Sequence, residues 1–124
     1  MYSAQVLDHF QNPRNPGEVS DPDAIAEIEN PACGDVLRLT LKIEAGRIAE
    51  IRFKAKGCVA SIACASALTE LVRGRAVDEV RLQNGESSIR QKLIAALGGL
   101  PQASTHAAQL ALDALSAALS TLKP

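Results

Sequence analysis

The chain has 124 residues and a mass of 13.0 kDa, which suits one domain, residues 1–124, with a single hydrophobic core. Hydrophobic residues make up 47% and charged residues 22%, a composition that excludes a disordered tail. The formal net charge is −1 and the only aromatic residues are Tyr2, Phe10 and Phe53, so no nucleic-acid-binding or anionic-membrane surface is expected.

The first predicted element is a short helix over residues 3–11. Ser3 can cap its N-terminus, and Val6 and Phe10 are four residues apart on one apolar face. The helix ends at the Asn-Pro-Arg-Asn-Pro-Gly run of residues 12–17, because two prolines and a glycine cannot continue it.

Three strands are predicted next, over residues 24–30, 35–43 and 47–56. The first alternates weakly and is expected at a sheet edge, and the third slips in its alternation near Ala49. The second alternates most clearly, with one apolar face made by Leu37, Leu39, Leu41 and Ile43. Because short turns join these segments, the pattern predicts an antiparallel meander.

After Gly57 the hydrophobic period changes from two to that of a helix. Helices are predicted over residues 59–72 and 76–82, then from Ser87 or Ser88 to Leu97, and finally from Ser104 or Thr105 onward. We therefore expect an α+β fold in which a small three-stranded antiparallel sheet packs against helices on one face.

The cellular location can also be inferred from the sequence. Asp8, His9 and Arg14 interrupt the amino-terminal segment, which does not resemble a signal peptide, and no apolar stretch suits a membrane span. Three cysteines are an odd number for a disulfide framework, so we expect a cytoplasmic protein with free thiols.

Four polar side chains lie at the ends of predicted elements. Cys33 and Asp35 are in the turn before the second strand, Cys58 joins the third strand to a helix, and His106 is in the first turn of the last helix. Such positions allow a rigid scaffold to present side chains to a common point. Two thiolates, a carboxylate and an imidazole are a complete ligand set for zinc or for an iron–sulfur cluster.

Helix ends support this interpretation, because free N–H groups stabilise a Cys58 thiolate and favour a neutral, metal-binding His106. The spacing is not diagnostic, and each residue also has a structural interpretation as a small buried cysteine or a surface histidine. Cys64 is expected to pack in the core, the alternative being a spare thiol that enters a rearranged site. His9 is expected to be a capping or packing residue.

Several motifs in order along the whole chain resemble the U-type iron–sulfur cluster assembly scaffolds, namely IscU, SufU and the N-terminal domain of NifU. The motifs are Tyr2, Asp8-His9-Phe10, Asn12-Pro13-Arg14-Asn15, Asn30-Pro31-Ala32-Cys33-Gly34-Asp35, Phe53-Lys54-Ala55-Lys56-Gly57-Cys58, Ser61-Ile62-Ala63, Thr69-Glu70-Leu71-Val72 with Gly74, and Leu100-Pro101 with His106. The resemblance implies the same α+β fold, with ligands gathered at one exposed end.

The resemblance also implies functional residues and partners. Cys33, Asp35 and Cys58 match the first cysteine, the aspartate and the second cysteine of the family, and His106 matches the histidine before the third cysteine. The implied cargo is a labile [2Fe–2S] cluster or iron, with zinc as a substitute in the purified protein. The implied partners are a cysteine desulfurase and recipient apo-proteins.

Two departures from the family pattern limit which activities and partners are expected. Ala107 replaces the third cysteine, which in the family receives sulfur and helps to hold the cluster. The run Pro101-Gln102-Ala103-Ser104 stands where the Isc branch has Pro-Pro-Val-Lys, so a dedicated Hsp70 chaperone is not carried over as a partner.

Three functions are compatible with these residues. The first is a scaffold or carrier without catalytic turnover, and the second is a degenerate scaffold that binds zinc or iron and docks a desulfurase without building clusters. The third is a thiol-dependent enzyme that uses Cys58 and His106, which no resemblance supports. Ala107 separates the first two, because a full scaffold has a cysteine there.

Overall fold

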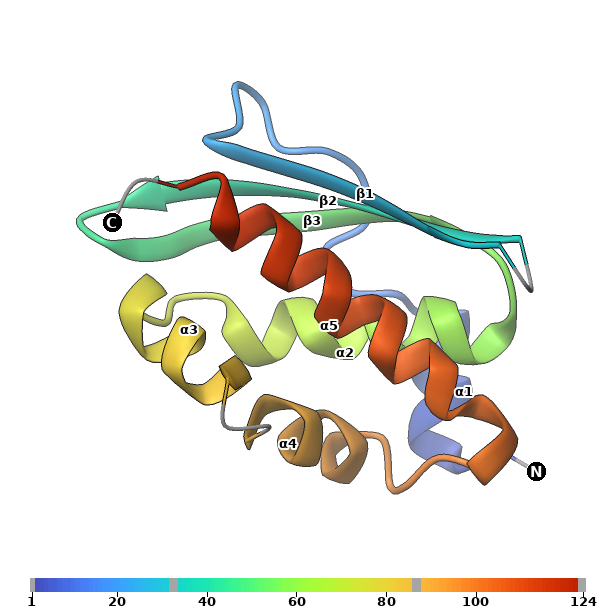
Figure 1. Cartoon of the computed structure of the whole chain (residues 1–124). Helices are drawn as coiled ribbons and strands as arrows, with labels where there is room; N and C mark the ends of the chain where they lie inside the picture. Colours follow the sequence, from blue (N-terminus) through green and yellow to red (C-terminus); the bar gives the residue numbers. More distant parts are fainter. Residues whose placement is uncertain (1, 32–33, 86–87, 123–124) are drawn as a thin grey trace.

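The computed structural model describes residues 2–31, 34–85 and 88–122 (Figure 1). Helices and strands follow the predicted order, with a short 3-10 turn before the last helix. The elements are α1 (Ala4–Gln11), β1 (Ala24–Asn30), β2 (Asp35–Glu44), β3 (Arg47–Lys56), α2 (Val59–Val72), α3 (Val77–Gly85), α4 (Ser88–Ala96), η1 (Gln102–Ser104) and α5 (Thr105–Ser120).

The three strands form one antiparallel sheet in the order β1-β2-β3, which confirms the predicted meander. Lys42 is opposite Glu50 and Ile43 is opposite Ile48, so Ala49 is an extra residue on β3. This β-bulge is the physical cause of the slip in the alternation pattern, because one additional residue reverses the face on which later side chains lie.

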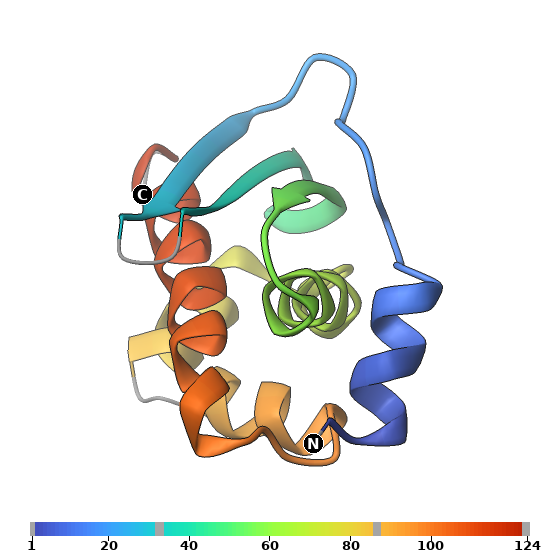
Figure 2. The same cartoon turned by 90° about the vertical axis from the view of Figure 1, so that its right-hand side faces the viewer.

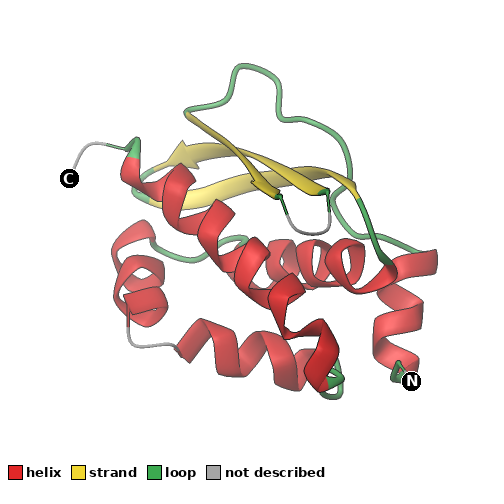
Figure 3. Ribbon diagram, turned by 45° about the vertical axis from the view of Figure 1, so that its right-hand side comes forward, coloured by secondary structure: helices red, strands yellow, loops and turns green. Residues whose placement is uncertain are grey.

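The helices cover one face of the sheet (Figures 1 and 3). Leu37, Leu39 and Leu41 project from β2 into the core and are fully buried. Figure 2 looks along α2, which is surrounded by the sheet, α1, α4 and α5. Small side chains on α2, including Ala60 and Ala63, allow these elements to approach it on several sides.

The buried face of α1 differs in one residue from the predicted apolar face. Ser3 accepts a hydrogen bond from the Val6 N–H at 3.0 Å, as a capping residue does, and Val6 is buried. Phe10 is 37% exposed, and His9 takes the second buried position against α2. Burial of His9 is feasible because its Nδ1 is 2.8 Å from the Ser66 hydroxyl.

The carboxyl-terminal helices follow the predicted pattern with shifted boundaries. The helix predicted over residues 76–82 is α3 and extends to Gly85, and Thr105 begins α5 after η1. Among the described helices, none is both long and apolar enough to cross a membrane.

Candidate metal centre

Asp35 is the first residue of β2, and its side chain is almost completely buried, with 4% of the residue exposed. Its Oδ2 atom accepts a hydrogen bond of 2.6 Å from the Ser61 hydroxyl on the first turn of α2. Within the described residues, its one ion-pair partner is His106, and no lysine or arginine contacts the carboxylate. A cation bound here would therefore compensate a buried negative charge.

Cys58 is the N-cap residue of α2, with an extended backbone that turns its thiol towards Asp35. The Sγ atom lies 3.6 Å from Asp35 Oδ2 and 3.3 Å from Ser61 Oγ. It makes no capping hydrogen bond to its own helix, and both of these contacts are to residues of the same cluster.

Gly57 is required by the close approach of the β3–α2 junction to Asp35. A Cβ atom at position 57 would lie 2.3 Å from Asp35 Oδ1, which no side chain can occupy without displacing the carboxylate. The glycine before Cys58 therefore leaves the space that the Asp35 carboxylate occupies.

His106 is the second residue of α5, and its side chain is 36% exposed. Its Nδ1 atom is 3.1 Å from the Ala103 carbonyl oxygen. Since a carbonyl can only accept, Nδ1 carries the hydrogen, and in the neutral ring Nε2 keeps a free lone pair. That Nε2 atom lies 3.9 Å from Asp35 Oδ2. The hydrogen bond from Nδ1 to the Ala103 carbonyl orients the ring, as a backbone carbonyl commonly does for an imidazole that binds metal.

The donor atoms of Asp35, Cys58 and His106 all lie within 4.8 Å of one another. They come from the N-terminal ends of β2, α2 and α5, so three of the four predicted ligands converge. Cys33, the fourth predicted ligand, lies outside the described residues. Thiolate, carboxylate and imidazole are a donor set that suits zinc and iron.

Cys64 is fully buried on α2, as predicted for a core residue. Burial, and to a lesser extent the neighbouring Cys58, raises the pKa of the Cys64 thiol to about 12. At neutral pH it is therefore a protonated thiol, a form that neither ligates metal nor attacks a disulfide.

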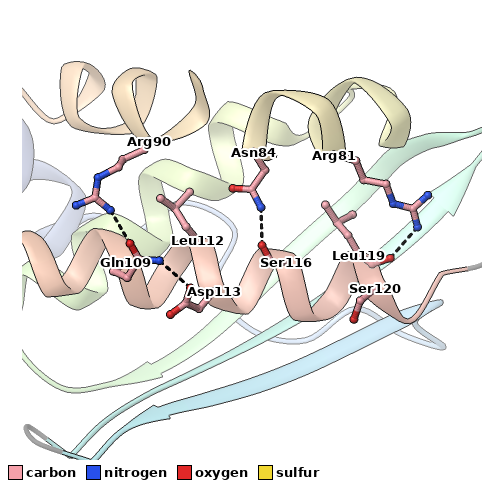
Figure 4. Close-up of a pocket in the computed structure, with 9 residues that line it drawn as sticks. All are labelled: Arg81, Asn84, Arg90, Gln109, Leu112, Asp113, Ser116, Leu119 and Ser120. Atoms are coloured by element: carbon pink, nitrogen blue, oxygen red, sulfur yellow. Dashed lines mark hydrogen bonds between the residues drawn. The ribbon is translucent and has the colours of Figure 1, made fainter. Parts of the chain in front are cut away.

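Two grooves flank α5. One, of about 320 Å³, begins at His106 between the end of β1 and the helix. The other, of about 440 Å³, separates α5 from α3 and α4 (Figure 4). Hydrogen bonds cross this second groove from Arg90 to Gln109 and from Asn84 to Ser116, so its polar groups join the helices to each other.

Comparison with known proteins identifies the family. The family model of the NifU-like N-terminal domain matches residues 1–123. The chain belongs to this family. The match confirms the resemblance to U-type scaffolds found in the motifs, and it extends over almost the whole chain.

Relatives of this NifU-like domain include two scaffold proteins. It is 41% identical over 119 residues to the iron–sulfur cluster assembly scaffold protein IscU 1 of Archaeoglobus fulgidus, covering 96% of this chain and 74% of the relative. It is 40% identical over 126 residues to the iron–sulfur cluster assembly scaffold protein IscU of Azotobacter vinelandii, covering 98% and 94% of the two chains.

The fold is shared with solved structures. The crystal structure of a nitrogen-fixing NifU-like protein (N-terminal) from Brucella abortus matches with a TM-score of 0.74 and 20% identity, covering 96% of this chain and 92% of that chain. This similarity shows that the sheet and helices have the same arrangement.

Ser61 is the site residue that sequence reasoning did not single out. It was part of a family motif, but no role was predicted for its hydroxyl, which bonds Asp35. A signal was present, because residues three apart on a helix share one face and Ser61 follows Cys58 by three positions.

Proposed function

We propose that this NifU-like domain binds a labile [2Fe–2S] cluster, or the iron from which one is built, and passes it on as a scaffold or carrier. The observation that carries the proposal is the convergence of Asp35, Cys58 and His106 at one partly exposed point. The proposal gains support from relatives that are named iron–sulfur cluster assembly scaffold proteins.

The proposed ligands are Cys33, Asp35, Cys58 and His106. Two thiolates and one carboxylate around a cluster of charge 2+ leave a net charge of −1, which a solvent-facing site tolerates. A hard carboxylate holds iron in a soft sulfide cluster less firmly than a thiolate does. Weak binding by Asp35 suits a protein that must release its cargo, and zinc is expected to replace iron in protein purified in air.

The proposed partners follow from this role. Sulfide has to come from a sulfur donor such as a cysteine desulfurase, and the cluster has to go to recipient apo-proteins. We propose no catalytic turnover, since in this role the ligand set holds and releases cargo and converts no substrate into a product.

Anaerobic purification followed by analysis of iron, zinc and acid-labile sulfide tests the proposal. We expect bound metal or cluster in the wild type, and metal–sulfur distances of ~2.3 Å by X-ray absorption when zinc is bound. Cys33→Ser and Cys58→Ser should each lower the metal content sharply, whereas Cys64→Ser, which changes a buried core thiol, should leave it unchanged. Equal loss of metal from all three variants would make Cys64 a ligand and contradict the proposed site.

Ala107 favours a second candidate function, in which the domain binds zinc or iron and docks a desulfurase without assembling clusters. The two functions differ in one measurement. A scaffold forms a cluster when supplied with desulfurase, cysteine and iron, whereas a regulator changes desulfurase turnover and forms no cluster.

A further inference from the structure

We infer that Ser61 is a positioning residue for metal binding, because its hydroxyl holds the Asp35 carboxylate in the orientation in which that carboxylate meets the other ligands. The inference rests on the proposed function. It gives a role to a residue that contacts a proposed ligand and is not itself a ligand. Ser61 is itself buried, so its hydroxyl is not available to solvent.

The two oxygens of Asp35 have different surroundings. Oδ2 lies 3.6 Å from Cys58 Sγ and 3.9 Å from His106 Nε2, so it is the oxygen that faces the other donor atoms. Ser61 donates its hydrogen bond to this same oxygen at 2.6 Å. Oδ1 lies on the other side, where only a glycine at position 57 leaves room for it.

The carboxylate is thus held between Gly57 and Ser61. An aspartate side chain can rotate about two bonds, and a buried carboxylate adopts the rotamer in which its charge is best hydrogen bonded. The Ser61 hydroxyl lies closer to Asp35 Oδ2 than either Cys58 Sγ or His106 Nε2 does. Without the Ser61 hydroxyl, the Asp35 side chain should therefore be able to rotate away from the other ligands.

The Ser61 hydroxyl also lies 3.3 Å from Cys58 Sγ, but that contact does not serve a bound metal. The hydroxyl hydrogen is donated to Asp35, so towards Cys58 the hydroxyl oxygen offers only a lone pair, which can accept a hydrogen bond from a thiol S–H. A metal-bound thiolate has no hydrogen to donate. In the loaded site, Ser61 therefore acts through Asp35.

Zinc affinity measured by competition with a chromophoric chelator tests the inference. Ser61→Ala should weaken zinc binding by about 10- to 100-fold, the usual loss when a residue that orients a ligand is removed. Ser61→Thr keeps the hydroxyl and should restore affinity to near that of the wild type. Circular dichroism and thermal unfolding establish that each variant folds.

Ser66 provides a matched control on the same helix. It is also a buried serine, but its Oγ bonds His9 and the Arg14 N–H on the α1 side of α2. Ser66→Ala removes the same atom and should lower the stability of the fold, yet it should leave zinc affinity unchanged.

A double-mutant cycle determines whether Ser61 acts through Asp35. In an Asp35→Ala background, Ser61→Ala should weaken zinc binding no further, because the ligand that it orients is gone. The visible spectrum of the Co²⁺-substituted Ser61→Ala protein should shift towards that of Asp35→Ala, which a purely structural role would not produce.

The outcomes separate this inference from the proposed function. If the wild type binds no zinc, or binds it without dependence on Cys58, the proposed function fails. If the wild type binds zinc through Cys58 but Ser61→Ala binds equally well, the positioning role is overturned and the function stands. The positioning role is also overturned if Ser61→Ala weakens binding equally with and without Asp35.

Discussion

At the scale of single residues, position 107 is expected to limit the chemistry of the candidate metal centre. Ala107 follows His106 in the first turn of α5 and is 1% exposed. Successive residues of a helix point about 100° apart, so His106 and residue 107 cannot occupy the same place. A thiol at position 107 would lie beside the histidine and could alternate with it during assembly, whereas the methyl group of alanine can neither accept sulfur nor bind iron.

Ala107→Cys is therefore expected to speed cluster assembly. The natural protein should bind a preformed cluster or metal, but it should build a cluster only slowly from desulfurase, cysteine and iron. The variant should assemble it severalfold faster, because it regains a sulfur-accepting thiol and a softer ligand. The measurement is cluster absorbance over time for both proteins side by side. Equal rates would show that a third cysteine is dispensable in this chain.

At the scale of elements, a buried histidine joins α1 to α2. His9 Nδ1 lies 2.8 Å from Ser66 Oγ, and its Nε2 lies 3.7 Å from a Glu70 oxygen. Burial lowers the pKa of His9, and Arg14 lowers it further, while Glu70 and Asp8 oppose the shift. The neutral ring is therefore the form that suits this helix contact.

Acid should consequently weaken the α1–α2 contact. Because the folded pKa lies below the ordinary value of 6.5, the unfolded chain takes up the proton first as the pH falls, and stability is lost below that value. Between about pH 7.5 and about pH 5.5, the free energy of unfolding in urea should fall more for the wild type than for His9→Gln, by up to about 1 kcal/mol. An equal fall in both proteins would exclude His9 as the cause.

At the scale of the whole molecule, the candidate metal centre joins segments that are far apart in sequence. Asp35, Cys58 and His106 begin β2, α2 and α5, and these three elements also pack around the common core. A bound ion would connect the sheet to both long helices in the folded chain, but it would find no such arrangement in the unfolded one. We therefore expect metal binding at this candidate site to be coupled to folding.

Zinc should stabilise the whole domain, with a gain that rises with the logarithm of the ratio of free zinc to the dissociation constant. At a free zinc concentration about 100 times the dissociation constant, the free energy of unfolding should rise by about 2.7 kcal/mol, and a chelator should reverse the gain. Thermal unfolding with and without zinc measures the effect. His106→Ala should reduce the gain, and a gain of full size in that variant would remove His106 from the ligand set.

The sequence by itself determined the elements and their order. The alternation along β2, the slip at Ala49 and the change of period after Gly57 are local patterns, and each corresponds to a feature of the structure. Local patterns also placed Asp35, Cys58 and His106 at the starts of elements, where the structure brings them together. Cys33 remains a predicted ligand, since it lies outside the described residues.

Tertiary structure alone decided which polar atoms meet. Periodicity did not show that α1 would bury His9 in place of Phe10, because that choice depends on a hydroxyl of Ser66 that lies 57 residues away. It did not show that Ser61 would bond Asp35, or that Gly57 would lie against the same carboxylate. A buried polar group takes its partner from whichever segment packs against it, and that neighbour is fixed by the fold of the whole chain.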